Sequence, residues 1–447
     1  MVINYKKENV LQSEFDLLST KSKEVVFPKV HDLYLFTVNY KTAPVAIREK
    51  FSIPEYSLTE ANQNLKKYNS LKSFLLLSTC NRTEIYFRTD NLEISTKEIH
   101  DFFTKNSGIE QKITKEYTTI VKENEVIEHA FKLACGLDSL VLGESQVLSQ
   151  LKSAYSIAQK EQTLDSTLEL LFQGAIKCAK EAHKKTSLSK NCQSISSAAI
   201  DLANKVCGPL KTKSIMVLGA GKMAKLALEH VIKIGGSKET VVLNRSPHRV
   251  IEFSDKYQAD RSIPFESVYE GMNDVDIVIA ATGAPHFIIF AEQFNQVRKD
   301  FDKSLFIFDI SMPRNIDSEF SKLPNVKLMD IDSLQIIYSQ TTDTNSEDLK
   351  LSNEIILEGI KKFYKQIEEK NIIPVIKTLK EKVEKIRTEK LSTIKTNGST
   401  VTLEELDYIT KNIVNTIFHK PIKNLKESKL YGSQEEKSQL LKDLFEL

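Results

Sequence analysis

The strongest constraint on the fold is a glycine-containing turn near the middle of the chain. The apolar run Ser214–Leu218 has the composition of a buried strand, and Gly219-Ala220-Gly221-Lys222-Met223-Ala224 follows it directly. A helical pattern then continues through His230. Glycines in such a turn let the backbone approach a pyrophosphate, and the free N–H groups of the following helix bind that anion. This order of strand, G-x-G-x-x-A turn and helix predicts a Rossmann-type dinucleotide-binding domain.

The end of the next strand indicates which dinucleotide is bound. The run 240–243 is strand-like and ends in Asn244, Arg245 and Ser246, where a site for NAD would carry an acidic residue. A guanidinium instead suits a 2′-phosphate, so the sequence favours NADP over NAD. A Rossmann-like domain that binds no cofactor is the alternative. The predicted cofactor-binding residues are Gly219, Ala220, Gly221, Lys222, Met223, Ala224, Asn244, Arg245 and Ser246.

Further apolar runs complete this domain. Residues 275–283 and 305–310 have the continuous hydrophobicity of strands covered on both faces of a parallel sheet, and 327–330 is the predicted last strand.

A polar segment, Ser78-Thr79-Cys80-Asn81-Arg82-Thr83-Glu84, stands between the apolar runs 74–77 and 85–87. We interpret it as a turn between two strands of an earlier α+β domain that begins with a strand at 33–38. Polar groups on a connection between rigid elements are typical of binding and catalytic sites. The alternative is a cysteine that only packs as a small hydrophobic residue.

Two helical segments follow this turn. The run 125–135 has helical periodicity and stops at Gly136, which suits a helix end. After the segment 137–146, apolar residues recur at helical spacing from Val147 to Ala158. Gln146 and Gln150 are four residues apart, so both point to one side of the start of this helix.

Composition limits the class of protein. A chain of 447 residues with 41% hydrophobic and 27% charged residues predicts two to four ordinary domains, and a formal charge of +2 neither requires nor excludes a nucleic-acid partner. The five cysteines have no C-x-x-C spacing, so no metal site is predicted and a reducing compartment is favoured. The start of the chain lacks a signal-peptide pattern, and no apolar run is long enough to span a membrane. We therefore expect a cytoplasmic protein that does not associate with membranes.

The chain changes character after about residue 343, where glycine becomes rare and Lys, Glu, Ile and Leu dominate. We expect long helices here, with Pro374 kinking or breaking one of them. The basic run 370–395 is either a solvated helix face or a surface for a polyanion or a partner subunit. An apolar stripe at Leu403, Leu406, Ile409 and Ile413 is more typical of dimerisation than of catalysis.

Several of these segments together resemble the glutamyl-tRNA reductase family. The resemblance is carried by the segment Ser78–Glu84, the run Gly136-Leu137-Asp138-Ser139-Leu140-Val141-Leu142-Gly143-Glu144 and the G-x-G-x-x-A turn. The segments 39–45 and 310–316 are also similar, so that the resemblance covers 33–447. It implies an α/β multidomain fold: an α+β N-terminal catalytic domain at 31–186, a Rossmann-type NADP-binding domain at 187–340 and an all-helical C-terminal dimerisation domain at 341–447, with residues 1–30 as a polar extension.

The resemblance also implies an activity and its partners. A homodimer would use NADPH to reduce glutamyl-tRNA(Glu) to glutamate-1-semialdehyde with release of tRNA, the first step of the C5 route to 5-aminolevulinate and tetrapyrroles. Transfer of the product to glutamate-1-semialdehyde aminomutase is compatible with this role. Cys80 corresponds to the family's nucleophile and His129 to a histidine important for activity. The implied substrate-binding residues are Thr79, Asn81, Arg82, Ser139, Glu144, Ser145, Gln146 and Gln150.

The chemistry explains why such an enzyme needs these residue types. A thiolate that displaces tRNA from the ester leaves a thioester, which hydride can reduce to an aldehyde. Arg82 could lower the thiol's pKa, but we expect it mainly to bind the γ-carboxylate of the substrate. For His129 we hypothesise protonation of the departing ribose oxygen or support of the thiolate.

Two positions depart from the family pattern. Tyr40 stands where the family commonly has His, and Ser145 where it commonly has Pro. Two other functions remain open at this point. An NADP-dependent dehydrogenase of a small molecule would leave the Cys80 turn unexplained, and a non-catalytic tRNA-binding regulator would not need both Cys80 and the glycines.

Overall fold

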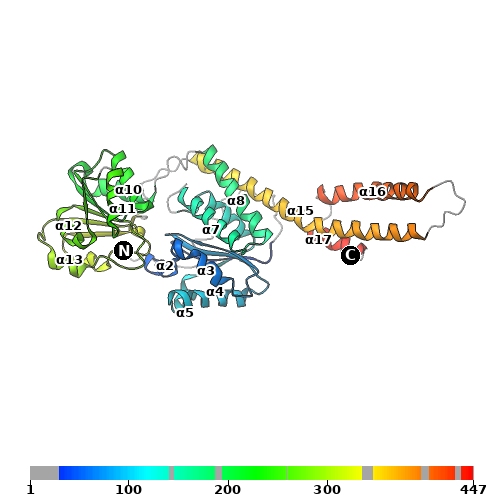
Figure 1. Ribbon diagram of the computed structural model, residues 1–447, viewed down its shortest axis with the longest axis horizontal. Coiled ribbons are helices and arrows are strands. Elements are labelled where there is room, and N and C mark those ends of the chain that lie inside the picture. Colours follow the sequence, from blue (N-terminus) through cyan, green and yellow to red (C-terminus); the bar gives the residue numbers. More distant parts are fainter. Residues whose placement is uncertain are drawn as a thin grey trace. The chain divides into compact units, whose positions relative to one another are not determined.

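The computed structural model describes residues 30–139, 145–186, 194–257, 259–334, 346–393, 402–427 and 434–445 (Figure 1). The predicted N-terminal extension, except its last residue, lies outside these ranges. The chain forms two compact units, one running to Gly359 and the other beginning at Ile360. The first unit contains two separate sheets.

The first sheet is antiparallel and has four strands. They are β1 (Leu33–Asn39), β2 (Ser73–Ser78), β3 (Arg82–Arg88) and β4 (Thr119–Lys122), in the order β2-β3-β1-β4. Aromatic side chains alternate between its two faces. Phe36 stacks on Phe103 of α4 (Leu92–Ser107), whereas Tyr86 meets the edge of Phe172 on α8 (Ser166–Lys185). Helices thus cover both faces, which accounts for the nearly continuous burial of these strands.

Short helices complete this α+β region. They are α2 (Val45–Phe51), η1 (Glu55–Ser57), α3 (Leu58–Leu65), α5 (Gln111–Tyr117), α6 (Asn124–Ala134) and α7 (Ser145–Lys160). The helices predicted at 125–135 and from Val147 are confirmed within a few residues.

The predicted turn over 78–84 is too long. Arg82, Thr83 and Glu84 belong to β3 and pair with β1, so the turn consists only of residues 79–81. Arg82 and Glu84 are two residues apart and share one face of the sheet, where they contact other charged groups. The polar character that suggested a turn therefore comes from a buried charge cluster on a strand.

The second sheet is parallel and has six strands. They are β5 (Ser214–Leu218), β6 (Glu239–Leu243), β7 (Arg261–Ile263), β8 (Ile277–Ala280), β9 (Leu305–Asp309) and β10 (Val326–Asp330), in the order β10-β9-β8-β5-β6-β7. The order reverses between β5 and β8, as in dinucleotide-binding folds. Helices α9 (Ile195–Cys207), α10 (Lys222–Lys233) and α11 (Pro247–Tyr257) pack on one face, and α12 (Val268–Asp274) and α13 (Ala291–Val297) on the other. The predicted strands and Rossmann topology are confirmed.

The last part of the chain is helical. The long helix α15 (Ser346–Ser392) extends from the first unit into the second, which also contains α16 (Leu403–Glu427) and α17 (Gln434–Phe445). Pro374 was predicted to kink or break a helix, and the break is wrong, because α15 continues through this residue. Proline removes one backbone hydrogen bond, and the turns on either side maintain the helix.

The second unit presents apolar side chains to solvent. Leu403, Ile409, Ile413 and Ile417 of α16 are each about half exposed or more. Such an apolar stripe on a helix is typical of a protein–protein interface. Within the described ranges, no helix is both long and apolar enough to cross a membrane.

Candidate active site

The turn that carries Cys80 is held by hydrogen bonds to its backbone groups. The hydroxyl of Thr79 accepts hydrogen bonds from the N–H groups of Asn81 and Arg82, both at 3.2 Å. The N–H of Thr79 donates to the carbonyl of Arg82 at 2.8 Å, and the N–H of Tyr40 donates to the carbonyl of Asn81 at 3.0 Å. These bonds close the tight turn between β2 and β3 and fix the position of Cys80 at its tip.

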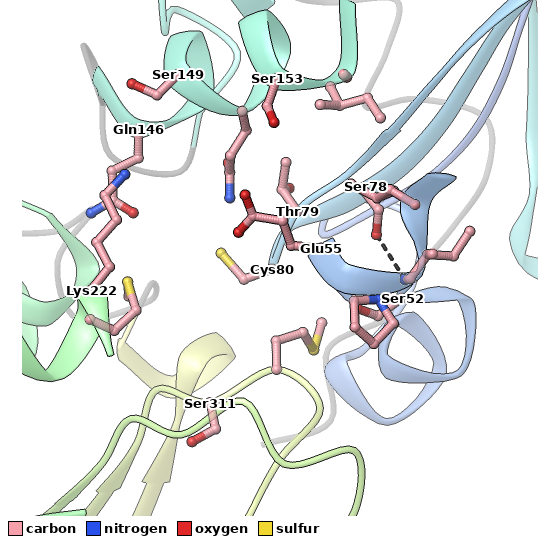
Figure 2. A pocket seen from close by; sticks show the side chains of 18 of the residues that line it. Ser52, Glu55, Ser78, Thr79, Cys80, Gln146, Ser149, Ser153, Lys222 and Ser311 are labelled. Atoms are coloured by element: carbon pink, nitrogen blue, oxygen red, sulfur yellow. Dashed lines mark hydrogen bonds between the residues drawn. The ribbon is translucent and has the colours of Figure 1, made fainter. Parts of the chain in front are cut away.

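Cys80 lies in a cavity of about 390 Å³ that is lined by both sheets' domains (Figure 2). The first sheet contributes the end of β2 and the segment around Ser52 and Glu55, and α7 forms another wall. The third wall is the carboxyl edge of the parallel sheet, represented by Lys222, Met223, Thr282, Ser311 and Met312. In such sheets this edge, at the point where the strand order reverses, is where nucleotides bind. The thiol therefore faces the side of the Rossmann domain that a nicotinamide would occupy.

Helix α7 presents a polar face to this cavity. Gln146, Ser149, Gln150 and Ser153 all line it, because residues three and four apart share one face of a helix. Gln146 and Gln150 were predicted from the sequence. The same spacing, extended by one turn, would have indicated Ser149 and Ser153 as well. The substrate-binding role of Gln146 and Gln150 remains a prediction.

Three buried polar atoms near the turn have no hydrogen-bond partner among the described residues. They are Oδ1 of Asn81, Oγ of Ser139 and Nε2 of Gln146. A buried polar group without a partner costs free energy, so such atoms in a native protein call for an explanation. Gln146 lines the cavity, so binding of a polar ligand there would explain its atom, whereas Asn81 and Ser139 do not line the cavity. All three residues were predicted to contact the substrate, and that role remains a prediction.

Behind the turn lies a buried charge cluster built on β3. Nη1 of Arg82 lies 2.7 Å from Oδ2 of Asp138 and 3.1 Å from Oε1 of Glu84. Nζ of Lys41 lies 2.8 Å from Oδ1 of Asp138. Burial alone would lower the pKa of Arg82, but the charges of Asp138 and Glu84 outweigh it and raise that pKa. Arg82 therefore remains a cation with both neighbours ionised.

His129 of α6 joins the same cluster. Its Nε2 lies 2.9 Å from Oε1 of Glu84, and its Nδ1 lies 3.4 Å from Oδ2 of Asp138. The Tyr86 hydroxyl donates to the other Glu84 oxygen at 2.8 Å. Burial raises the pKa of Glu84, but His129 and Arg82 overcome this and lower it to about 2. Burial likewise opposes ionisation of Asp138, yet Arg82 and His129 hold its pKa below its usual range.

Arg82 and His129 do not line the cavity; they stand in the cluster behind it. Tyr40, one of the two departures from the family pattern, places its ring 5.9 Å from the Arg82 guanidinium. The two charged residues that do line the cavity are Glu55 and Lys222. Glu55 was not predicted, because nothing in its local sequence distinguishes it from a surface glutamate. The roles predicted for Arg82 and His129 remain predictions.

The glycine turn after β5 has the geometry that a dinucleotide requires. Gly219 has a φ of +111°, and a Cβ there would lie 2.4 Å from the carbonyl oxygen of Ala281. A Cβ on Gly221 would instead meet open space, and the start of α10 has no side-chain cap. The first N–H groups of α10 are therefore oriented to receive an anion. Asn244, Arg245 and Ser246 follow β6, as predicted, and Arg245 is exposed.

A buried carboxylate shapes the nearby edge of the cavity. Asp309, at the end of β9, accepts hydrogen bonds from the N–H groups of Ser311, Asn315 and Ile316 at 2.8 to 3.0 Å. Burial raises the pKa of Asp309 to about 6, although these donors act in the opposite direction. Asp309 thereby fixes the segment that carries Ser311 and Met312.

Two predicted residues cannot be placed. Glu144 lies outside the described residues, and of Ser145 only the backbone, at the start of α7, is described. Among the residues that are described, no group of three or more His, Cys, Asp and Glu side chains could hold a metal ion.

These features define a class of protein. A parallel sheet with a dinucleotide-binding turn faces a cavity that contains a cysteine, which is the arrangement of an oxidoreductase that binds a nicotinamide cofactor. Family comparisons agree with the division into regions. Residues 36–186 match the N-terminal domain of glutamyl-tRNAGlu reductase, 201–337 match shikimate/quinate 5-dehydrogenase, and 352–447 match the dimerisation domain of glutamyl-tRNAGlu reductase.

Similarity to individual proteins extends over nearly the whole chain. Glutamyl-tRNA reductase of Carboxydothermus hydrogenoformans is 34% identical, with 93% of each chain covered, and that of Oceanobacillus iheyensis is 36% identical, with 91% of this chain and 90% of the relative covered. The solved glutamyl-tRNA reductase of Methanopyrus kandleri aligns over 94% of this chain and 100% of its own, with 24% identity and a TM-score of 0.48. On the sequence relatives, the chain belongs to the glutamyl-tRNA reductase family. The predicted family, fold class and enzyme class are confirmed.

Proposed function

We propose that this protein uses NADPH to reduce the glutamyl ester of tRNA(Glu) to glutamate-1-semialdehyde and releases the tRNA. The observation that carries this proposal is the cavity in which Cys80 lies beside Lys222, Met223, Ser311 and Met312. A reaction in which acyl transfer to a cysteine is followed by hydride transfer needs a nucleophile and a dinucleotide-binding edge in the same cavity. Membership of the family supports the same reaction.

Cys80 performs the first step. Its thiolate attacks the ester carbonyl, the bond between the carbonyl carbon and the ribose oxygen breaks, and the tRNA leaves after its oxygen takes up a proton. The glutamyl group remains on Cys80 as a thioester. We propose His129 as the source of that proton; an alternative role is support of the thiolate through the charge cluster. The amide and hydroxyl groups of Asn81, Ser139 and Gln146 orient the glutamyl group.

The nucleotide turn prepares the second step. Gly219, Gly221 and the first N–H groups of α10 would hold the pyrophosphate, and Arg245 after β6 would hold the 2′-phosphate that distinguishes NADPH from NADH. When bound, NADPH supplies the hydride that converts the thioester into the aldehyde and returns Cys80 to the thiolate. The cavity walls of α7 and the 310–316 segment limit the access of water, which would otherwise hydrolyse the thioester.

Selection of glutamate requires a cation for the γ-carboxylate. We propose Arg82 for this role, as the sequence predicts. Arg82 stands behind the cavity and already pairs with Asp138 and Glu84, so this role requires the substrate's carboxylate to displace one of these partners. A guanidinium can donate hydrogen bonds to several carboxylate oxygens at once.

The remaining assignments concern the whole protein. We propose catalytic, NADP-binding and dimerisation domains at 31–186, 187–340 and 341–447, and a homodimer formed through the last of these. We also propose a cytoplasmic enzyme whose product passes to glutamate-1-semialdehyde aminomutase.

The decisive experiment separates the two steps. We expect the protein, mixed with glutamyl-tRNA in the absence of NADPH, to form a covalent glutamyl adduct that mass spectrometry locates on Cys80. Addition of NADPH should then release glutamate-1-semialdehyde, and Cys80→Ser should show neither event. NADPH oxidation that does not depend on charged tRNA would contradict the proposal and support a dehydrogenase of a small molecule. Binding of the tRNA without an adduct or an aldehyde would support a regulator.

A further inference from the structure

Helix α2 connects the Cys80 turn with the edge of the parallel sheet. Its residue Glu49 forms a two-pronged ion pair with Arg314, with Nε to Oε2 at 3.0 Å and Nη2 to Oε1 at 2.8 Å. The backbone N–H of Arg314 donates to the same carboxylate at 3.2 Å. Both side chains are mostly buried, each 17% exposed. A bidentate pair of this kind fixes relative orientation as well as distance.

A second ion pair lies one residue away on the same helix. Nη1 of Arg48 lies 2.8 Å from Oδ1 of Asp332, and Oδ2 of Asp332 accepts the N–H of Val45 at 2.8 Å. Arg48 is only 1% exposed and also donates to the carbonyl of Ala43. Asp332 follows β10, whereas Arg314 follows β9. Helix α2 is therefore held at two adjacent points of the parallel sheet, and we call these two ion pairs the α2 bridges.

The other end of α2 is tied to the turn that carries Cys80. The hydroxyl of Thr83 on β3 donates to the carbonyl of Phe51, the last residue of α2, at 3.2 Å. The N–H of Ile53 donates to Oγ of Ser78, the last residue of β2, at 2.9 Å (Figure 2). A movement of α2 would thus move both strands that flank Cys80.

The residues of the parallel-sheet domain that form the α2 bridges are also held in place. Arg314 belongs to the segment that Asp309 anchors through three backbone N–H groups. The same segment provides Ser311 and Met312, which line the cavity across from Cys80. A continuous series of short contacts therefore links Cys80, through α2 and the α2 bridges, to the opposite wall.

We propose that the α2 bridges set the position of Cys80 relative to the nicotinamide-binding edge and so act as positioning elements for hydride transfer. This inference rests on the proposed function. Neither ion pair touches the cavity, so attack by Cys80 on the ester does not require them. Reduction of the thioester does require them, because it depends on alignment between the Cys80 turn and the edge of the parallel sheet. A misplacement of about 1 Å in such an alignment can cost roughly 100-fold in rate.

The test measures both steps in single turnover for Glu49→Gln. We expect formation of the glutamyl adduct on Cys80 without NADPH to change by less than about twofold. Formation of the aldehyde should slow by at least about tenfold. Exchange of the charges in a Glu49→Arg, Arg314→Glu double variant should recover much of the lost rate. Glu239→Gln, which removes the 3.1 Å pair with Arg261 inside the Rossmann domain, is the matched control and should leave both steps unchanged.

A second readout does not depend on activity. Alkylation of Cys80 in the apo protein, followed by mass spectrometry of its peptide, reports how closely the opposite wall covers the thiol. Glu49→Gln should speed this labelling several-fold, and the charge exchange should reverse the effect. An unaltered labelling rate together with an unaltered aldehyde rate would overturn the proposal, as would an equal loss of both chemical steps. If the wild-type protein forms no aldehyde, the proposed function fails, while the labelling result still decides whether the α2 bridges hold the two walls together.

Discussion

The two sides of the Cys80 turn differ in how their polar groups are satisfied. On the cavity side, Gln146 has a buried polar atom with no partner among the described residues, and Cys80 lies beside residues of the parallel sheet. On the other side, Arg82, Glu84 and Asp138 form an almost fully buried cluster with close ion pairs. The two environments are close in the chain, because only Asn81 stands between Cys80 and Arg82.

This difference indicates that the two sides of the turn have different roles, one in ligand binding and the other in stability. Unsatisfied groups are available to a ligand, whereas satisfied ones have fixed positions and resist change, because removal of one member leaves its neighbour as an unpaired buried charge. Substitutions on the cluster side should therefore affect stability together with activity. Substitutions on the cavity side should affect activity alone. The following experiments test this contrast.

The largest effect is expected from Glu84→Gln. Glutamine keeps the shape but removes the charge that faces Arg82 and His129, so the free energy of unfolding should fall by about 3 kcal/mol. Urea unfolding followed by tyrosine fluorescence can measure this, because the chain has no tryptophan. Glu229→Gln, which removes an exposed 3.6 Å pair with Lys225, should cost less than about 0.5 kcal/mol. If both variants lower the free energy of unfolding equally, the buried cluster contributes no more to stability than an exposed ion pair.

His129→Asn should slow release of tRNA in single turnover by about 100-fold if His129 acts as the general acid. Asparagine can still donate a hydrogen bond to Glu84 but cannot deliver a proton at neutral pH. The matched control is His230→Asn, since His230 pairs with Asp201 at 2.7 Å inside the Rossmann domain. An unchanged rate for His129→Asn would exclude the acid role.

Acid should weaken the cluster in a defined pH range. The pKa of Glu84 is lowered from 4.5 to about 2 in the folded protein, after His129 and Arg82 outweigh the opposing effect of burial. Its contribution to stability is thus complete above about pH 4.5 and is lost as the pH falls toward 2. Glu84→Gln should show a shallower decline of melting temperature over this range than the wild type. Parallel curves would show that Glu84 does not carry the acid sensitivity.

The smallest effect is expected from Gln146→Ala on the cavity side. Loss of one hydrogen-bonding amide should raise the KM for glutamyl-tRNA by about fivefold, with kcat and the melting temperature little changed. Ser149→Ala, on the same face of α7, tests whether the effect is specific to the amide. A drop in melting temperature for Gln146→Ala would mean that this side chain supports the fold.

Local sequence pattern was sufficient for much of the fold. The run Ser214–Leu218 with its glycine turn predicted the Rossmann domain, and the resulting sheet has the strand order of dinucleotide-binding folds. Such predictions succeed because alternation, periodicity and glycine conformation act within a few residues. The predicted break at Pro374 failed for the converse reason. The local prediction considers only the backbone hydrogen bond that proline removes. The long helix α15 keeps the hydrogen bonds of the turns on either side of Pro374 and therefore continues.

The sequence by itself determined the chemistry available to this protein: a cysteine beside polar residues, a dinucleotide turn and a basic residue after the second strand. Only the tertiary structure decided that Arg82, Glu84, His129 and Asp138 form one buried cluster, and that Glu49 and Arg48 reach Arg314 and Asp332. These partners are brought together by the packing of elements distant in the sequence. Ion pairs of this kind have no local signature, because their strength depends on the burial and geometry that the whole fold creates.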